Sequence, residues 1–337
     1  MELSEYRPRA RLRVKRTQVP RAAVPAIDAH NHLGRWLTGD WAVPDVPELI
    51  RLMDSCGVRT IVNLDGRWGE ELEANLDRYD RAYPGRFVTF CHVDWGLPGE
   101  AAAQSLARSV AAGARGLKVW KDLGLHVRDP AGALLLPDDR RLGPLWETAA
   151  DLGVPVAIHT ADPVAFFDPV DGRNERYEQL MANPAWSFAD TTRFPRFERL
   201  MRALETLVAR HPRTTFVAVH AGCNAEDLTW VARMLASYPN LYIDIAARIA
   251  ELGRQPRATR ELVLRFPDRV LFGTDEFPPD ADVYATHFRF LETLDEAFAH
   301  SADDPPLMGR WTISGLGLPP DVLTRVYAAN AARLLRL

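Results

Sequence analysis

The stretch Pro25-Ala26-Ile27-Asp28-Ala29-His30-Asn31-His32 is the first of eight short apolar runs that decide the fold class. Each run is rich in strand-forming residues, is bounded by turn residues, and is separated from the next by a longer helical pattern. The other seven runs are Arg59–Asp65, Phe87–Asp94, Ala114–Trp120, Pro155–Thr160, Thr215–Ala221, Leu241–Ala246 and Arg269–Asp275. Alternating strands and helices are typical of a parallel sheet, and eight such units predict an α/β fold, the (β/α)₈ TIM barrel.

Between these runs, apolar residues recur at spacings of three and four residues, which predicts helices. The expected helices are Val46–Cys56, Glu70–Tyr83, Glu100–Ala112, Leu142–Leu152, Phe197–His211, Ala225–Tyr238 and Thr259–Phe266. A long insertion, Ala161–Pro195, follows the fifth strand and carries several aromatic residues. We expect it to form a structured lid or binding loop, the alternative being an apolar cluster packed on the rim. A helical closure is expected over Asp321–Leu335.

The overall composition excludes several classes of protein. The 337 residues include 41 Lys and Arg against 45 Asp and Glu, a net charge of −4 that excludes a generic nucleic-acid binder. A hydrophobic content of 47% excludes a disordered chain, and no run of about 18 apolar residues suggests a membrane span. Three isolated cysteines form no CxxC motif, so neither a disulfide framework nor a thiolate zinc site is indicated. We expect a cytoplasmic protein.

The chain is expected to form a single barrel domain over residues 24–337, preceded by an arm over residues 1–23. The arm is basic, since Arg7–Arg21 contains only cationic charged residues. Two interpretations of the arm remain open. It packs on a second copy of the chain in a homo-oligomer, or it is solvated.

The first strand ends in the motif His30-Asn31-His32. Because side chains alternate between the two faces of a strand, Asp28, His30 and His32 are expected to point the same way. Two imidazoles on one face can chelate one metal ion. Chance alone yields about 0.2 such His-x-His pairs in a chain of this composition, so the motif by itself is a moderate signal.

Other polar residues end later strands. His159, His220 and Asp275 each follow an apolar run, and in a TIM barrel the carboxyl ends of the strands meet at one mouth, where barrel enzymes place their chemistry. Imidazoles and a carboxylate together favour Zn²⁺, or Mn²⁺ or Fe²⁺, over the all-oxygen sites of Mg²⁺ and Ca²⁺. His92 is expected either to line this mouth or to be structural.

Lys118 is expected to face the barrel interior, where a buried amine needs a partner or a modification. Three interpretations remain open. The amine carries CO₂ as a carbamate that bridges two metal ions, it binds an anionic group of the substrate as ammonium, or it forms an internal ion pair with a residue such as Asp94.

These motifs resemble those of the amidohydrolase superfamily. The resemblance rests on Ile27–His32, His159, His220 and Phe272-Gly273-Thr274-Asp275, and the tail is similar to that of the amidohydrolase-related branch in Gly315–Pro319 and Tyr327–Leu335. It implies a metal held by His30, His32, His159 and Asp275, with His220 as acid, base or electrophile. In binuclear members, His159 and His220 would hold a second ion and Lys118 would bridge both.

The branch contains metal-dependent hydrolases and lactonases, and also non-oxidative decarboxylases. We expect first a hydrolase that uses metal-activated water on an amide, ester or lactone bond, with Asp275 accepting the water proton and His220 beside it. The alternatives are a decarboxylase of a small, ring-bearing carboxylated compound and a barrel that only binds. The expected partner is a small molecule, neither nucleic acid nor membrane. The candidate substrate contacts are Trp120, Lys121, Arg173, Tyr177 and Arg248.

Overall fold

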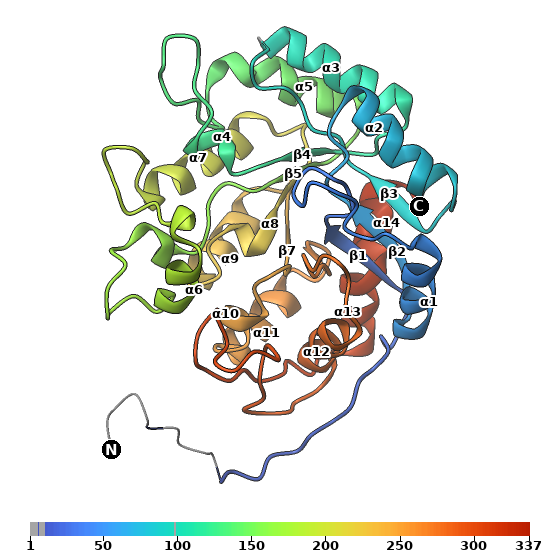
Figure 1. The fold of residues 1–337 in the computed structure, drawn as a ribbon, viewed down its shortest axis with the longest axis vertical. Coiled ribbons are helices and arrows are strands. Elements are labelled where there is room, and N and C mark those ends of the chain that lie inside the picture. The colour runs from blue at the N-terminus through green and yellow to red at the C-terminus, as the bar shows by residue number, and fades with distance from the viewer. Residues whose placement is uncertain (1–5, 7–10, 98) are drawn as a thin grey trace.

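Eight parallel strands form the centre of the protein, and helices surround them (Figure 1). The computed structural model describes residue 6 and residues 11–97 and 99–337. The strands are β1 Ala26–Asn31, β2 Val58–Asn63, β3 Phe87–Thr89, β4 Leu117–Val119, β5 Val156–Ile158, β6 Phe216–Ala218, β7 Leu241–Asp244 and β8 Val270–Leu271. All eight predicted strands are confirmed, each shorter than its predicted run, and β2 begins one residue before its run, at Val58.

The strands pair in chain order, as a TIM barrel requires. β1, β2 and β3 form one parallel sheet, and β4 to β8 form a second. Backbone hydrogen bonds join the two sheets on both sides. The amide of Lys118 donates to the carbonyl of Cys91 over 2.8 Å, and the amide of Ala29 donates to the carbonyl of Phe272 over 2.9 Å. The predicted fold class is confirmed.

Helices cover the outside of the strands where the apolar periodicity predicts them. The longer helices are α1 Val46–Cys56, α2 Gly69–Asn75, α3 Gly99–Ala112, α5 Gly143–Leu152, α7 Phe197–Arg210, α9 Leu228–Ser237, α11 Pro256–Arg265 and α12 Ala281–Glu292. The shorter helical segments are η2 Leu76–Arg81, α4 Asp122–Leu125, η3 Arg140–Leu142, η4 Val164–Phe167, α6 Tyr177–Ala182, η5 Pro184–Trp186, α8 Val219–Gly222, α10 Ile249–Leu252, α13 Pro320–Thr324, η6 Arg325–Ala329 and α14 Asn330–Leu335. Helix α12, which packs against α1, is not among the helices predicted from the sequence.

Local chemistry sets the ends of these helices, as α1 illustrates. Asp45 accepts a hydrogen bond from the amide of Glu48 over 2.9 Å, which satisfies one of the free N–H groups at the start of the helix. At the other end, Gly57 adopts φ = 75°, a left-handed conformation that a glycine enters without steric cost.

The inside of the barrel is a separate apolar cluster. Ile27, Val62, Ala157, Val217 and Leu271 meet there and are buried. Burying one such side chain stabilises the fold by roughly 1.5–3 kcal/mol. Two residues of α14 also belong to this cluster, namely Ala331 and Leu335. The predicted C-terminal helical closure therefore contributes to the core of the barrel.

The long insertion is structured and docked against the barrel. Phe166, Leu180 and Phe188 of the insertion share an apolar cluster with Leu200 and Met201 of α7. The guanidinium of Arg176, 1% exposed, forms an ion pair with the carboxylate of Glu251 on α10, 2% exposed. The insertion is thus held to the barrel by both an apolar cluster and a buried charge pair.

The described part of the N-terminal arm runs away from the ring of helices (Figure 1). Its contacts lie near its end, where the amide and hydroxyl of Thr17 donate to Asp295 over 2.6 and 2.9 Å. The amide of Ala23 donates to Glu292 over 2.9 Å. Arg7 and Arg9, which contribute to the basic character predicted for the arm, lie outside the described residues. None of the described helices has the length and apolar character needed to cross a membrane.

Candidate metal centre and substrate pocket

Three predicted metal ligands come together where β1 and β8 end. Nε2 of His32 lies 3.3 Å from Oδ1 of Asp275, and Nε2 of His30 lies 3.6 Å from the same oxygen. One donor atom from each of these residues lies within 4.8 Å of the other two. His30 lies near the end of β1, His32 directly follows β1 and Asp275 follows β8, so the backbone of the barrel brings them to one point.

Asp28 does not share a face with the two histidines, so that prediction is wrong. Its carboxylate accepts hydrogen bonds from the hydroxyls of Thr274 and Tyr284 over 2.7 and 2.8 Å. The cause is a register shift in the pairing of β1 with β2 between Asp28 and Asn31. Such a bulge breaks the simple alternation of side chains along the strand.

His220 reaches the site through an unusual backbone conformation. Val217 and Val219 face the barrel interior, so simple alternation would direct His220 outward. Instead, His220 and Ala221 adopt φ of 60° and 53°. Left-handed backbone costs a residue with a side chain about 1–2 kcal/mol, and such strain concentrates at functional sites. The turn brings Nε2 of His220 to 3.9 Å from Oδ2 of Asp275.

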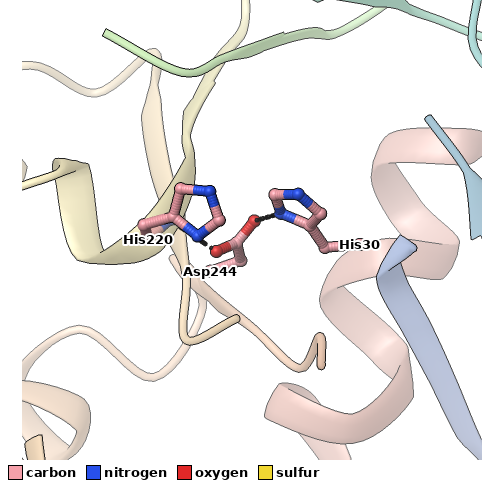
Figure 2. Close-up of side chains that lie close together, drawn as sticks. All are labelled: His30, His220 and Asp244. Atoms are coloured by element: carbon pink, nitrogen blue, oxygen red, sulfur yellow. Dashed lines mark hydrogen bonds and ion pairs between the residues drawn. The ribbon is translucent and has the colours of Figure 1, made fainter. Parts of the chain in front are cut away.

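Asp244 is also part of the site, although it is not among the site residues predicted from the sequence. It ends β7, is 1% exposed, and lies between His30 and His220 (Figure 2). Nδ1 of His30 donates to Oδ2 of Asp244 over 2.8 Å, and the amide of His220 donates to Oδ1 over 2.7 Å. Its position at a strand end is the one sequence signal that could have indicated it.

His159 has a different partner from the other predicted ligands. Its Nε2 lies 3.3 Å from Oδ1 of Asp162, whose other oxygen accepts from the ammonium of Lys121. The ring of His159 meets that of His220 edge to face, with centroids 4.5 Å apart. Within the described part of the chain, His159 is in no convergent group of three donors. The structure therefore gathers no donor set for a second ion around it.

Lys118 lies inside the barrel, with 1% of its surface exposed. Its Nζ is 3.3 Å from Nε2 of His30 and 5.2 Å from the ring centre of Trp120. Among the residues that the structure describes, no carboxylate forms an ion pair with it, Asp94 included. Of the three interpretations of Lys118, the internal ion pair with Asp94 is therefore wrong.

Burial and neighbouring charges set the protonation of the site. Burial lowers the pKa of His32 to about 4 and that of Lys118 to about 8. Burial lowers the pKa of His220 well below its usual range, helped by the charges around it. Burial by itself would raise the pKa of Asp275, but the rings of His30 and His32 and the charge of Lys118 hold that pKa well below its usual range. At neutral pH the site therefore offers neutral rings at His32 and His220 and an ionised carboxylate at Asp275.

These residues fit a divalent metal ion. His30 gives its Nδ1 proton to Asp244, so its Nε2 carries the lone pair, which lies 3.3 Å from Nζ of Lys118. His32 Nδ1 is buried and has no hydrogen-bond partner in the described part of the chain. Two neutral imidazoles and one carboxylate are the donor types that Zn²⁺ and Mn²⁺ accept.

A cavity of about 310 Å³ adjoins the site, since its lining includes Lys118 and Trp120, which contact His30 and His32, but none of the three converging ligand residues. Its walls carry four tryptophans and two cationic side chains. These residues are Trp36, Arg67, Trp68, Trp95, Lys118 and Trp120. The guanidinium of Arg67 stacks between two of these rings, 4.7 Å from the centre of Trp36 and 4.1 Å from that of Trp68. In this stacked position the guanidinium forms no ion pair within the described structure, so its N–H groups remain able to donate hydrogen bonds.

The same cavity carries two acidic side chains and one structural imidazole. Asp94 and Asp122 lie in its wall, and each also accepts a hydrogen bond from a nearby backbone amide. His92 lines the cavity as well, but its Nε2 is committed to the carbonyl of Leu64 over 2.7 Å. The cavity therefore combines aromatic faces with both donors and acceptors.

The predicted substrate contacts lie in different places. Trp120 lines the cavity, and its ring centre is 4.9 Å from that of His32. Arg248 is 6% exposed, donates from Nη1 to the carbonyl of Ala247 over 2.7 Å, and leaves Nε without a partner in the described chain. Lys121 forms an ion pair with Asp162, and the side chain of Lys121 is 24% exposed. Arg173 and Tyr177 are exposed on the insertion and do not line the cavity.

Comparisons with known proteins agree with this architecture. A sequence profile described as amidohydrolase matches residues 27–337. No curated protein matches the sequence. A solved structure of 2,6-dihydroxybenzoate decarboxylase from Rhizobium is similar, with a TM-score of 0.60, 18% identity, and coverage of 93% of this chain and 99% of that chain.

Two further solved structures are similar to the chain. One is a dihydroxybenzoic acid decarboxylase from Polaromonas sp. JS666 with bound manganese and the inhibitor 2-nitroresorcinol, with a TM-score of 0.61, 18% identity, and coverage of 93% and 97%. The other is a 5-carboxyvanillate decarboxylase from Sphingomonas paucimobilis, with a TM-score of 0.54, 16% identity, and coverage of 94% and 100%. At these identities the similarity demonstrates a common fold.

Proposed function

Because the chain belongs to the amidohydrolase family, we propose that it is a metal-dependent, non-oxidative decarboxylase of a small aromatic carboxylate. The observation that carries this proposal is the cavity adjoining the site, which joins tryptophan faces to the cations of Lys118 and Arg67. Aromatic walls favour a planar ring, and buried cations favour its carboxylate. The names of the decarboxylases with the same fold describe aromatic acids as their substrates, and this supports an aromatic carboxylate as the substrate.

The residues proposed to hold the metal are His30, His32 and Asp275. We leave His159 and His220 outside this set, since neither belongs to that convergent group. A bound divalent ion would supply a Lewis acid that draws electron density from the substrate. Zn²⁺ is the expectation from the donor types, and Mn²⁺ is the ion present in the Polaromonas structure, so both are tested.

The chain's own residues bind and orient the substrate. The ammonium of Lys118 and the guanidinium of Arg67 would hold anionic groups, while Trp36, Trp68 and Trp120 would contact the ring. Asp94 and Asp122 would accept hydrogen bonds from hydroxyl or amine substituents of that ring. A single site of this size therefore suits a ring that carries one acidic group and at least one hydrogen-bond donor.

The reaction needs one proton and no water: R–COO⁻ + H⁺ gives R–H + CO₂. The bond from the ring carbon to the carboxylate breaks, and its electron pair takes up the proton. Nδ1 of His220 donates to the carbonyl of Ala246 over 2.8 Å, which leaves Nε2 as the atom free to accept and return a proton. Asp275 lies beside it and is the second group through which that proton can pass.

Hydrolysis, the first expectation from the sequence, is the second candidate. It is supported by the position of Asp275, whose carboxylate lies 3.3 Å from Nε2 of His32 and 3.9 Å from Nε2 of His220, where it could accept a proton from water. Activated water would then attack an amide, ester or lactone carbonyl, and His220 would stabilise the developing negative charge. The substrate would again be a small molecule, since the cavity is about 310 Å³.

The decisive experiment measures CO₂ and ¹⁸O in the same reaction. Protein loaded with Mn²⁺ or Zn²⁺ is incubated in H₂¹⁸O with a panel of hydroxybenzoates and the corresponding esters and lactones. We expect CO₂ release from a hydroxybenzoate without a hydrolytic product. A new carboxylate labelled with ¹⁸O, without CO₂ release from any acid, would instead identify a hydrolase.

Two variants test the assignment of His220. His220→Asn should lose at least about 100-fold in kcat while its metal content stays that of the wild type, because a proton-transfer group is typically worth 10²–10⁴-fold. His211→Asn, at the end of α7, is the matched control and should keep full activity. A fall in metal content in His220→Asn would make His220 a ligand.

A further inference from the structure

Asp244 lies between His30 and His220 in the site (Figure 2). It is separated from His30 by 214 positions and from His220 by 24, yet its carboxylate bonds to both. We propose that Asp244 is a positioning residue that fixes the metal-binding tautomer of His30 and, at the same time, the left-handed backbone of His220. This inference rests on the metal site of the proposed function.

The first half of the argument concerns His30. A neutral imidazole carries one N–H and one lone pair, so the partner of one nitrogen decides the state of the other. Oδ2 of Asp244 accepts the Nδ1 proton of His30 over 2.8 Å in a region with 2% or less side-chain exposure. The lone pair is thereby placed on Nε2, the atom that lies 3.6 Å from Asp275. Carboxylates of this kind orient ligating histidines and raise their basicity.

The second half concerns His220. Oδ1 of Asp244 accepts hydrogen bonds from the amides of His220 and Ala246 over 2.7 and 3.2 Å. These two bonds hold the backbone where His220 adopts φ = 60°. The carbonyl of Ala246 accepts the Nδ1 proton of His220 over 2.8 Å, so that ring also turns its Nε2 lone pair toward the site. One carboxylate therefore organises both imidazoles.

A competing role for Asp244 is direct metal ligation, since His30, His220 and Asp244 also place three donors within 4.8 Å of one another. The hydrogen bonds argue against it. Each oxygen of Asp244 already accepts at least one N–H, and the 2.8 Å contact with His30 leaves no space for an ion between the two atoms. The experiment below separates the two roles.

Asp244→Asn keeps the shape of the side chain and removes the second acceptor. If the amide oxygen faces His220, the NH₂ group donates to Nδ1 of His30 and favours the ring proton on Nε2, so His30 must change tautomer before it binds a metal. The flipped amide would set its NH₂ group against the backbone N–H donors of His220 and Ala246, so the first orientation is expected.

The test measures Mn²⁺ affinity by calorimetric titration of the full chain, for wild type, Asp244→Asn and the control Asp80→Asn. Asp80 is a carboxylate outside the site that similarly accepts from an amide and a hydroxyl, both of Thr89. We expect Asp244→Asn to bind Mn²⁺ about 10–100-fold more weakly, as is typical when a partner of a ligating histidine is lost. Asp80→Asn should bind as the wild type does. Equal affinity of Asp244→Asn and wild type would overturn the proposal.

Co²⁺ spectra at saturation distinguish positioning from ligation. The visible spectrum of Asp244→Asn should match that of the wild type, because the ligands are unchanged, whereas that of Asp275→Asn should differ. A spectrum of Asp244→Asn that changes like that of Asp275→Asn would make Asp244 a ligand and overturn the inference. If the wild type binds neither Mn²⁺ nor Co²⁺, the proposed function fails as well, and this result is distinct from the others.

A measurement on the wild type keeps the proposal testable even if the variant does not fold. In ¹⁵N-histidine-labelled, metal-free protein, long-range ¹H–¹⁵N correlations report which ring nitrogen carries the proton. We expect His30 to be protonated at Nδ1. An Nε2-protonated His30 would overturn the proposal.

Discussion

Nζ of Lys118 lies 3.3 Å from Nε2 of His30, so a buried amine touches a proposed metal ligand in the barrel interior. The amine has no ion-pair partner in the described part of the chain, and burial lowers its pKa to about 8. Two interpretations of Lys118 therefore remain, namely a carbamate that bridges two ions and an ammonium that binds the substrate. A bridging carbamate needs a second ion, and in the described part of the chain no convergent set of donors around His159 could hold one. The interpretation of Lys118 as a substrate-binding ammonium is therefore favoured.

We predict that Lys118→Met leaves one metal ion per chain and raises KM for the carboxylate substrate by about 10–100-fold, since a hydrogen bond to a charged group contributes about 1.5–3 kcal/mol. Metal content by elemental analysis and the intact mass of the native wild type check this prediction. A mass increase of one CO₂, together with two ions that fall to one in the variant, would instead establish the bridging carbamate.

Arg67 is predicted to determine affinity for a second polar or anionic group of the substrate. Arg67→Met keeps much of the contact with Trp36 and Trp68 but removes the charge. We expect KM to rise about 10–100-fold for a substrate that engages this guanidinium, with metal content and melting temperature unchanged. The exposed Arg140, changed in the same way, is the control. A loss confined to kcat would contradict a binding role.

The ion pair between Arg176 and Glu251 is predicted to hold the insertion in place. Removing one partner leaves a buried charge uncompensated, so Arg176→Met should lower the free energy of unfolding by about 3–5 kcal/mol. The double variant Arg176→Met/Glu251→Leu should lose less than that. Urea unfolding measures both, and Arg213→Met, which breaks an exposed pair with Asp151, should cost under about 1 kcal/mol. If the double variant loses the sum of the unfolding free energies lost in the two single variants, Arg176 and Glu251 are not coupled through their ion pair.

His287 is predicted to contribute to acid sensitivity. Burial lowers its pKa to about 4, and its Nδ1 proton is donated to the carbonyl of Val283 over 2.8 Å. Between about pH 6.5 and pH 4 the unfolded chain binds a proton at this residue and the folded chain does not. The free energy of unfolding therefore falls as pH falls through this window, by about 3 kcal/mol in total.

His287→Phe removes that proton uptake and keeps an aromatic ring beside Phe272. The difference in the free energy of unfolding between pH 7 and pH 4.5 should shrink by about 2–3 kcal/mol in the variant. Urea titrations at the two pH values measure it. Parallel pH dependences of variant and wild type would show that His287 titrates normally in the folded protein.

Much of the fold could be predicted from the sequence because strands and helices follow local patterns. The apolar runs match all eight strands, although β2 begins one residue earlier than its run, and the spacing of apolar residues gives α1 with its observed limits, Val46–Cys56. The predicted strands extend beyond the observed ones, since apolar character continues into the turns at the strand ends. The predicted convergence of His30, His32 and Asp275 follows from a general property of barrels, because all strands end at one mouth.

Other features depended on the tertiary structure. The orientation of Asp28 follows from a register shift, and that of His220 from a positive φ, and neither is encoded in the alternation of side chains. Asp244 and the stacked Arg67 gain their significance from contacts with residues distant in the sequence. The sequence by itself therefore determined the barrel and the residue types at the ends of its strands, because these depend on local periodicity. Only the tertiary structure decided which polar groups face one another, because that depends on backbone conformation and packing across the barrel.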